Sequence, residues 1–263
     1  MPLADLGDIR VNYQLDGTPD GPTLVFANSL GTDLHVWDDV VTRLPPSLRI
    51  IRYDLRGHGG TSATPAPYSM GALVRDAERL LDHLGVRDCI FVGLSIGGMI
   101  AQGLAVKRLD LIRGLVLSNT AAKIGTAAKW QQRIDAIKQD GLDAVADTIM
   151  QNWFAPAFYR SPELAHWRAQ LLGQSVEGYI GCCAAIAGTD FYTPTSGLRL
   201  PTLGIAGSDD GATPADLVRE TVDLIPGSRF ELIRRAGHLP CVEQPDIFAD
   251  RLVTFLRELG HID

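Results

Sequence analysis

The stretch "VGLSIGGMIAQ", residues 92–102, places Ser95 between Gly93 and Gly97 at the junction of two elements. The apolar run 89–93 predicts a buried strand, and the apolar segment 96–108 predicts a helix. A serine on so tight a strand-to-helix turn is held exposed in a strained conformation, and the flanking glycines leave room for it. The pattern G-x-S-x-G also occurs by chance in glycine-rich connections, so the rest of the chain has to decide whether Ser95 is a nucleophile.

Length and composition are those of an ordinary globular chain. The 263 residues are 46% hydrophobic and 21% charged, which suits one α/β unit carrying an insertion. The net charge of −7 argues against a general nucleic-acid or anionic membrane surface. The N-terminal residues show no secretory signal, and no run of 18 apolar residues occurs, so we expect a cytoplasmic protein. The four cysteines form no CxxC pair, so we expect buried free thiols, and we expect neither a metal nor a cofactor.

Strand and helix patterns alternate along most of the chain. Strands are expected at 8–15, 23–28, 48–55, 89–93, 111–120, 200–207 and 228–237, and helices at 68–85, 96–108, 214–227 and 246–259. Such alternation predicts a mostly parallel sheet with helices on both faces. Residues 121–195 interrupt it with helix-like segments and three of the four tryptophans. We therefore expect a core of residues 1–120 and 196–263, and a helical lid of residues 121–195 over the strand ends, where such sheets bind ligands.

A serine nucleophile needs a base, and the base needs a carboxylate to orient it. Of the six histidines, His238 alone follows a late strand, in the loop "RRAGHLPCVEQP". The strand before it leads into "GSDDGATP", which offers both Asp209 and Asp210. The start of the helix after Ser95 offers the backbone N–H of Ile96 to a developing oxyanion. These positions predict a Ser-Asp-His hydrolase.

With these positions in order, the whole chain resembles an α/β-hydrolase, in which nucleophile, acid and base follow one another along the sequence. Within that superfamily it is most similar to the bacterial 3-oxoadipate enol-lactonases. The matching segments are "NSLGTDLHVWDDVV", "YDLRGHGG", "VGLSIGGMIAQGLA", "AAKIGTAAKWQQRI", "IAGSDDGATP" and "AGHLPCVEQP". Among these matches, the lid segment "KIGTAAKW" is the strongest support for the resemblance, because lid sequences differ between hydrolases of different activity. Two residues depart from the family pattern: Thr61 stands where a serine is usual, and Gly211 stands where a proline often follows the acid. We expect neither to take part in the chemistry.

The resemblance implies cofactor-free hydrolysis of 3-oxoadipate enol-lactone in bacterial aromatic catabolism, the β-ketoadipate pathway. In such hydrolases the acid usually stands three residues after the glycine that ends its strand and four before a proline, which selects Asp210 over Asp209. The second oxyanion N–H is expected from Leu30, the third residue of an H-G-x pattern in which Asn28 replaces the histidine. Asp54 and Arg56 of "YDLRGHGG" are expected to brace their loop rather than take part in the chemistry.

A carboxylated substrate would need a local cation in this acidic chain. Arg133 lies three residues after Trp130 and would share its helix face, and a guanidinium suits a carboxylate. Lys123 is the other candidate cation. We therefore expect Trp130 and Arg133 to bind the substrate. The expected partner is a small-molecule lactone or ester rather than a nucleic acid or membrane, and the oligomeric state stays open.

Two other classes of function share the same sequence features. A carboxylesterase, a C–C hydrolase or a haloperoxidase-type perhydrolase would use the same three residues, so pocket residues and substrate assays must distinguish them. A non-catalytic ligand receptor could be built on the same scaffold. Labelling of Ser95 by a fluorophosphonate would separate a hydrolase from a receptor.

Overall fold

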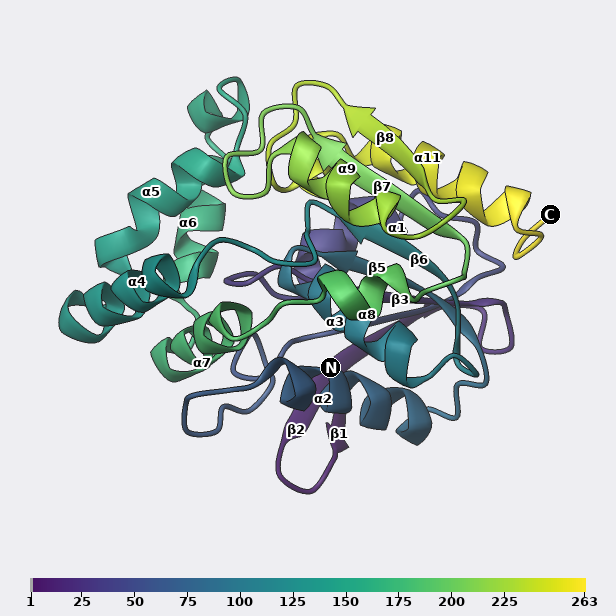
Figure 1. The fold of residues 1–263 in the computed structure, drawn as a ribbon, viewed down its shortest axis with the longest axis horizontal. Coiled ribbons are helices and arrows are strands. Elements are labelled where there is room, and N and C mark those ends of the chain that lie inside the picture. The colour runs from purple at the N-terminus through teal and green to yellow at the C-terminus, as the bar shows by residue number, and fades with distance from the viewer. Residues whose placement is uncertain (1) are drawn as a thin grey trace.

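The computed structural model describes residues 2–263 and is built around an eight-stranded sheet, in the order β1-β2-β4-β3-β5-β6-β7-β8 (Figure 1). The strands are β1 (Leu3–Asp5), β2 (Arg10–Gly17), β3 (Thr23–Ala27), β4 (Arg49–Tyr53), β5 (Cys89–Leu94), β6 (Ile112–Ser118), β7 (Thr202–Gly207) and β8 (Arg229–Ile233). The pairs β1–β2 and β2–β4 are antiparallel, and all pairs from β4 to β8 are parallel. The expected mainly parallel α/β sheet is confirmed.

Helices cover both faces of this sheet. One face carries α2 (Met70–His83), α3 (Ile96–Lys107), α8 (Tyr192–Ser196) and α9 (Ala215–Asp223). The other face carries α1 (Asp38–Val41) and α11 (Pro245–Glu258), with the short helices η1 (Leu34–Trp37) and α10 (Pro240–Glu243) packed beside them. Because helices cover both faces, β3, β5 and β7 are buried along their whole length. None of the helices in residues 2–263 is long and apolar enough to cross a bilayer.

The element boundaries differ from the expected ones where local signals are weak. Strand β1 was not expected, because three residues are too few to show an alternating pattern. Strand β8 ends at Ile233, although the apolar pattern predicted a strand over 228–237. The reason is Arg235, whose φ of 59° turns the chain out of the extended conformation. The residues after this turn form the loop that leads to His238.

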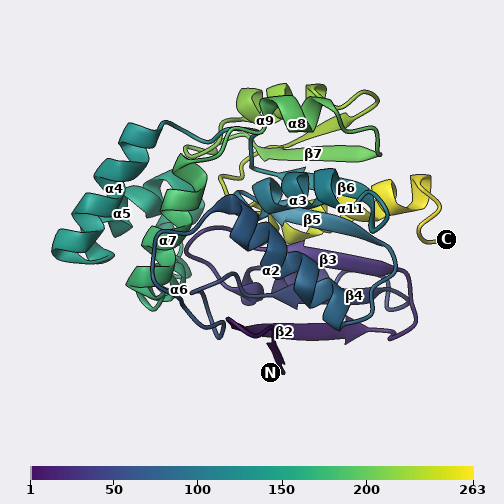
Figure 2. The ribbon, with the colours of Figure 1, turned by 60° about the horizontal axis from the view of Figure 1, so that its bottom comes forward.

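The remaining helices gather at the end of the sheet where the parallel strands finish (Figure 2). They are α4 (Ala127–Asp140), α5 (Asp143–Trp153), η2 (Phe158–Arg160), α6 (Leu164–Leu172) and α7 (Val176–Ala187). All of them lie within residues 121–195, for which we keep the name lid. Helix α8, at the end of this segment, packs against α3 rather than beside α4–α7.

One flank of the lid rests on the loop of residues 54–68, main chain against main chain. A Cβ on Gly178 of α7 would lie only 2.2 Å from the carbonyl oxygen of Gly57, so this contact requires a residue without a side chain. The carboxylate of Glu177 accepts the N–H of Ala66 at 2.5 Å, and the amide oxygen of Gln174 accepts that of Gly59 at 2.9 Å. These bonds fix the start of α7 on the core.

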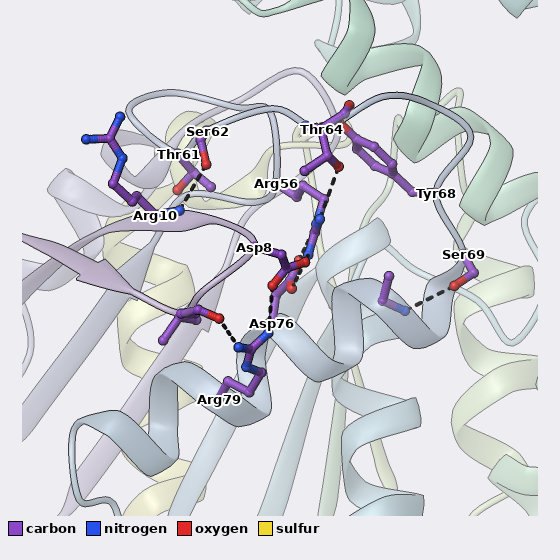
Figure 3. Close-up of polar contacts among 12 residues, drawn as sticks. Asp8, Arg10, Arg56, Thr61, Ser62, Thr64, Tyr68, Ser69, Asp76 and Arg79 are labelled. Atoms are coloured by element: carbon purple, nitrogen blue, oxygen red, sulfur yellow. Dashed lines mark hydrogen bonds and ion pairs between the residues drawn. The ribbon is translucent and has the colours of Figure 1, made fainter.

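The loop of residues 54–68 is itself held by buried charges (Figure 3). Arg56 donates to both carboxylate oxygens of Asp76, at 2.7 and 2.6 Å, to Asp8 at 2.9 Å and to Thr64 at 3.0 Å. The carboxylate of Asp54 accepts the backbone N–H groups of Leu34 and Gly60 at 2.7 and 2.8 Å. Both side chains brace the loop, as expected from the sequence.

Candidate active site

Ser95 lies on a strained turn between β5 and α3. Its φ is +58° and its ψ is −118°, a conformation that a residue with a side chain rarely adopts. Neighbouring backbone fills the space on either side. A Cβ on Gly93 would lie 2.3 Å from the carbonyl oxygen of Gly97, and a Cβ on Gly97 would lie 2.3 Å from that of Ala27. The two glycines flanking Ser95 in the motif are therefore required by close backbone approach.

His238 and Asp210 form a buried pair after the last two strands. The imidazole Nδ1 lies 2.9 Å from Asp210 Oδ2, and the two side chains are 2% and 0% exposed. Asp209 is exposed at the surface, where its carboxylate accepts the hydroxyl of Ser208 at 3.3 Å. The structure thus brings Asp210, and not Asp209, to the histidine.

The surroundings of Asp210 keep it ionised. Its Oδ1 accepts the backbone N–H groups of Ala212 and Thr213 at 2.7 and 3.0 Å, and its Oδ2 accepts Asn119 Nδ2 and Thr213 Oγ1, each at 2.8 Å. Burial opposes ionisation, but the charge and hydrogen bond of His238 and the other donors outweigh it, so the pKa of Asp210 lies below its ordinary value. An ionised Asp210 accepts the Nδ1 proton and leaves Nε2 free to act as a base.

The Nε2 of His238 faces the loop after β3 and lies 3.4 Å from the hydroxyl of Ser29. Ser95 lines the same cavity as Ser29 and His238. Ile96 is the first residue of α3, so its N–H has no acceptor within the helix. Within residues 2–263, the N–H of Leu30 donates to no protein acceptor either. Both groups therefore remain available to an oxygen bound beside Ser95.

The cavity beside Ser95 has a volume of about 270 Å³ and lies between the strand ends and the lid. Its lid wall includes Trp130, Arg133 and Lys129 of α4, together with Trp153 of α5 and Tyr179 of α7. The guanidinium of Arg133 lies 4.9 Å from the centre of the Trp130 ring. Of the described residues that line this cavity, none is an Asp or Glu, and neither Lys129 nor Arg133 has a carboxylate within 4.0 Å. The two cations that line the cavity are therefore not neutralised by a lining carboxylate, and the carboxylate of Asp210 is engaged behind His238.

The fold agrees with that of known proteins to which the chain is similar. The family model of the alpha/beta hydrolase fold matches residues 22–245. This chain belongs to the α/β-hydrolase family. It is 37% identical to 3-oxoadipate enol-lactonase 2 of Acinetobacter baylyi, covering 92% of this chain and 91% of that protein. It is 32% identical to 3-oxoadipate enol-lactonase 1 of the same organism, covering 95% and 94%. The crystal structure of the enol-lactonase from Burkholderia xenovorans superposes with a TM-score of 0.94 at 35% identity, covering 97% of this chain and all of that one.

The hydrolase brings together most of the residues expected from its sequence. Ser95, His238, Leu30, Trp130 and Arg133 all line one cavity, while Asp210 and Ile96 lie directly behind it. Lys123, the other candidate cation, does not line this cavity. It pairs with Asp190 at 3.0 Å on the exposed surface, so it cannot meet a ligand beside Ser95.

Several residues of the hydrolase's site were missed by the sequence analysis. Lys129 could have been found, because it precedes Arg133 by four residues on the same helix face. Asn119 directly follows β6, the strand between those that lead to Ser95 and Asp210, and its polar side chain at a strand end was an available signal. Ser29 and Thr213 gave no such signal, since only the folded loops bring them to the histidine. Within residues 2–263, no group of three or more His, Cys, Asp or Glu side chains is placed to hold a metal ion.

Proposed function

We propose that this hydrolase opens a small enol-lactone that carries a carboxylate, converting 3-oxoadipate enol-lactone to 3-oxoadipate in bacterial aromatic-compound catabolism. The observation that carries the proposal is the charge of the cavity. Ser95 and His238 share it with Arg133 and Lys129, and no carboxylate among the described lining residues neutralises those cations. The similarity to enol-lactonases over more than nine-tenths of the chain supports the same substrate.

Two cations without a carboxylate partner beside a nucleophile favour an anionic substrate over a neutral ester. A guanidinium binds a carboxylate through parallel hydrogen bonds, and Lys129 adds a second positive charge on the same face of α4. The Trp130 indole is fixed by its own bond, because Nε1 donates to the carbonyl of Ile124 at 2.6 Å. It therefore offers a rigid apolar wall beside the guanidinium, against which a flat five-membered ring can pack.

In the proposed mechanism the lactone opens in two steps. His238, oriented by Asp210, takes the proton of Ser95 as the serine oxygen attacks the lactone carbonyl, and the N–H groups of Leu30 and Ile96 hold the oxyanion. The ring C–O bond then breaks, and the departing enolate oxygen receives the proton from His238. The resulting enol tautomerises to a ketone, moving the proton from its oxygen to the adjacent carbon, which makes reclosure unfavourable. Water, deprotonated by His238, then attacks the acyl-enzyme, and the returned proton restores Ser95.

The first step requires Ser95 to reach the histidine nitrogen that now faces Ser29. Because Nε2 lies 3.4 Å from Ser29 Oγ, the two hydroxyls have to share or exchange this nitrogen when a substrate enters. Such contacts are often loose in a free enzyme and tighten in its substrate complex.

The test is a spectrophotometric assay of enol-lactone loss, run beside p-nitrophenyl acetate. We expect kcat/KM for the lactone to exceed that for the neutral ester. A simple ester that is turned over faster by orders of magnitude would overturn the lactonase function and leave a general esterase.

A further inference from the structure

Glu243, at the end of α10, joins two segments that are far apart in the sequence. Its Oε1 accepts the backbone N–H of Gly237 at 2.6 Å, and its Oε2 accepts that of Ala155 at 3.0 Å. Gly237 directly precedes His238, and Ala155 follows the end of α5 in the lid. One carboxylate therefore holds the loop of the histidine against the lid.

The same two segments also touch through their main chains. The N–H of His238 donates to the carbonyl of Trp153 at 2.7 Å, and a Cβ on Gly237 would lie 2.4 Å from that oxygen. The loop of Asp210 is attached in the same way, because the N–H of Gly211 donates to the carbonyl of Asn152 at 3.1 Å. The end of α5 is thus the common support of both loops.

Glu243 does not line the cavity among the described residues, so it meets no ligand beside Ser95. Its two bonds instead fix the backbone on which the imidazole is mounted. The ring reaches its place through only two side-chain torsions, so a shift of the backbone at residues 237 and 238 moves Nε2 relative to Ser95. We propose that Glu243 is a positioning residue, which sets the place of His238 by clamping its loop to the end of α5. This proposal rests on the proposed role of His238 as the base.

The test compares Glu243→Gln and Glu243→Ala with Glu177→Gln as the matched control. A glutamine retains one acceptor oxygen, but its amide nitrogen faces an N–H group, so one of the two bonds is lost. We expect kcat for the lactone to fall about 10-fold in Glu243→Gln and about 100-fold in Glu243→Ala, since a small misplacement of a catalytic group has effects of this size. KM should stay within about 3-fold, because the side chain lies outside the cavity.

Glu177 gives the control because its carboxylate also accepts a backbone N–H between lid and core, that of Ala66. That bond lies on the opposite flank of the lid and touches neither triad loop. Glu177→Gln removes the same charge but keeps an oxygen for its single bond, so it should change kcat less than about 2-fold. All assays are run well below the unfolding temperature of each variant.

Two readouts separate this proposal from the proposed substrate. The rate of Ser95 labelling by a fluorophosphonate depends on the base but not on the lactone, and it should fall in parallel with kcat. The low-field proton resonance of the His238 Nδ1–H should shift or broaden in Glu243→Gln and stay unchanged in Glu177→Gln. If the wild type is labelled but does not open the lactone, the substrate is wrong and the labelling rates still decide the role of Glu243. Equal labelling rates for Glu243→Gln and Glu177→Gln would overturn the clamp, and a wild type that is not labelled would overturn both proposals.

Discussion

Arg133→Gln is the most direct perturbation of the proposed substrate selectivity. The guanidinium lies over the Trp130 ring and lines the cavity beside Ser95, and no carboxylate of the described chain pairs with it. A hydrogen bond between charged groups contributes about 1.5–3 kcal/mol. Since about 1.4 kcal/mol corresponds to a tenfold change, we expect KM for the carboxylated lactone to rise roughly 10- to 100-fold. Glutamine keeps much of the side-chain length, so the loss is mainly one of charge.

The assay measures kcat and KM for the enol-lactone and for p-nitrophenyl acetate in parallel. The neutral ester has no carboxylate to bind, so its KM should change less than about 3-fold in Arg133→Gln. Lys123→Gln is the control, because Lys123 is an exposed cation that pairs with Asp190 outside the cavity. It removes the same unit of charge and should leave both substrates unaffected. An equal rise in KM for both substrates, or the same effect in Lys123→Gln, would refute carboxylate binding by Arg133.

Three further changes test the catalytic residues and their ionisation. Ser95→Ala should lower kcat on the order of 10³-fold or more, measured in the lactone assay, because the members of such a triad act as one unit. The pKa of Asp210 is lower in the folded protein, so its ionised form stabilises the fold above about pH 4 and this contribution is lost as the pH falls through the lowered value. Urea unfolding between pH 3 and 7 should show the wild type losing stability toward acid relative to Asp210→Asn. Burial, with Asp209 and Asp210 nearby, raises the pKa of Glu243 from 4.5 to about 7, so the unfolded state releases its proton first as the pH rises. The free energy of unfolding should therefore fall by on the order of 3 kcal/mol between about pH 4.5 and 7 relative to Glu243→Gln, and a difference between the two proteins that stays constant with pH would contradict this.

The sequence predicted those parts of the site whose position follows from chain order. Ser95 comes directly after β5, and Asp210 and His238 lie in the loops that follow β7 and β8. Parallel strands deliver their carboxyl ends to one edge of the sheet, so these three positions meet there. The apolar runs of these strands and the glycines beside them are local sequence signals, so the order of strands and helices could be predicted from short segments of the chain. The strained φ of Ser95 likewise has a local cause in the two flanking glycines.

The lid side of the site could be predicted only in part, because it depends on how helices pack. Trp130 and Arg133 share a face through helical spacing alone, and that face does line the cavity. Lys129 was missed and Lys123 was named as the alternative cation, because which lysine reaches the cavity depends on where α4 begins. Lys123 precedes the helix and pairs with Asp190. Glu243 bonds to Ala155, 88 positions earlier in the sequence, and to Gly237 across a loop. Periodic sequence patterns predict neither contact.

The carbonyl oxygens at the end of α5 have a consequence for how this enzyme can change over evolution. The carbonyl groups of Trp153 and Asn152 support His238 and Gly211, respectively. Trp153 and Asn152 also line the cavity. Substitutions at these positions can therefore alter which molecules fit without removing the attachment of the catalytic loops. Selection can explore new substrates at residues 152 and 153 while the hydrolytic machinery is inherited intact. Gly237 does not tolerate such changes, because any side chain there would displace the contact between its backbone and the carbonyl of Trp153.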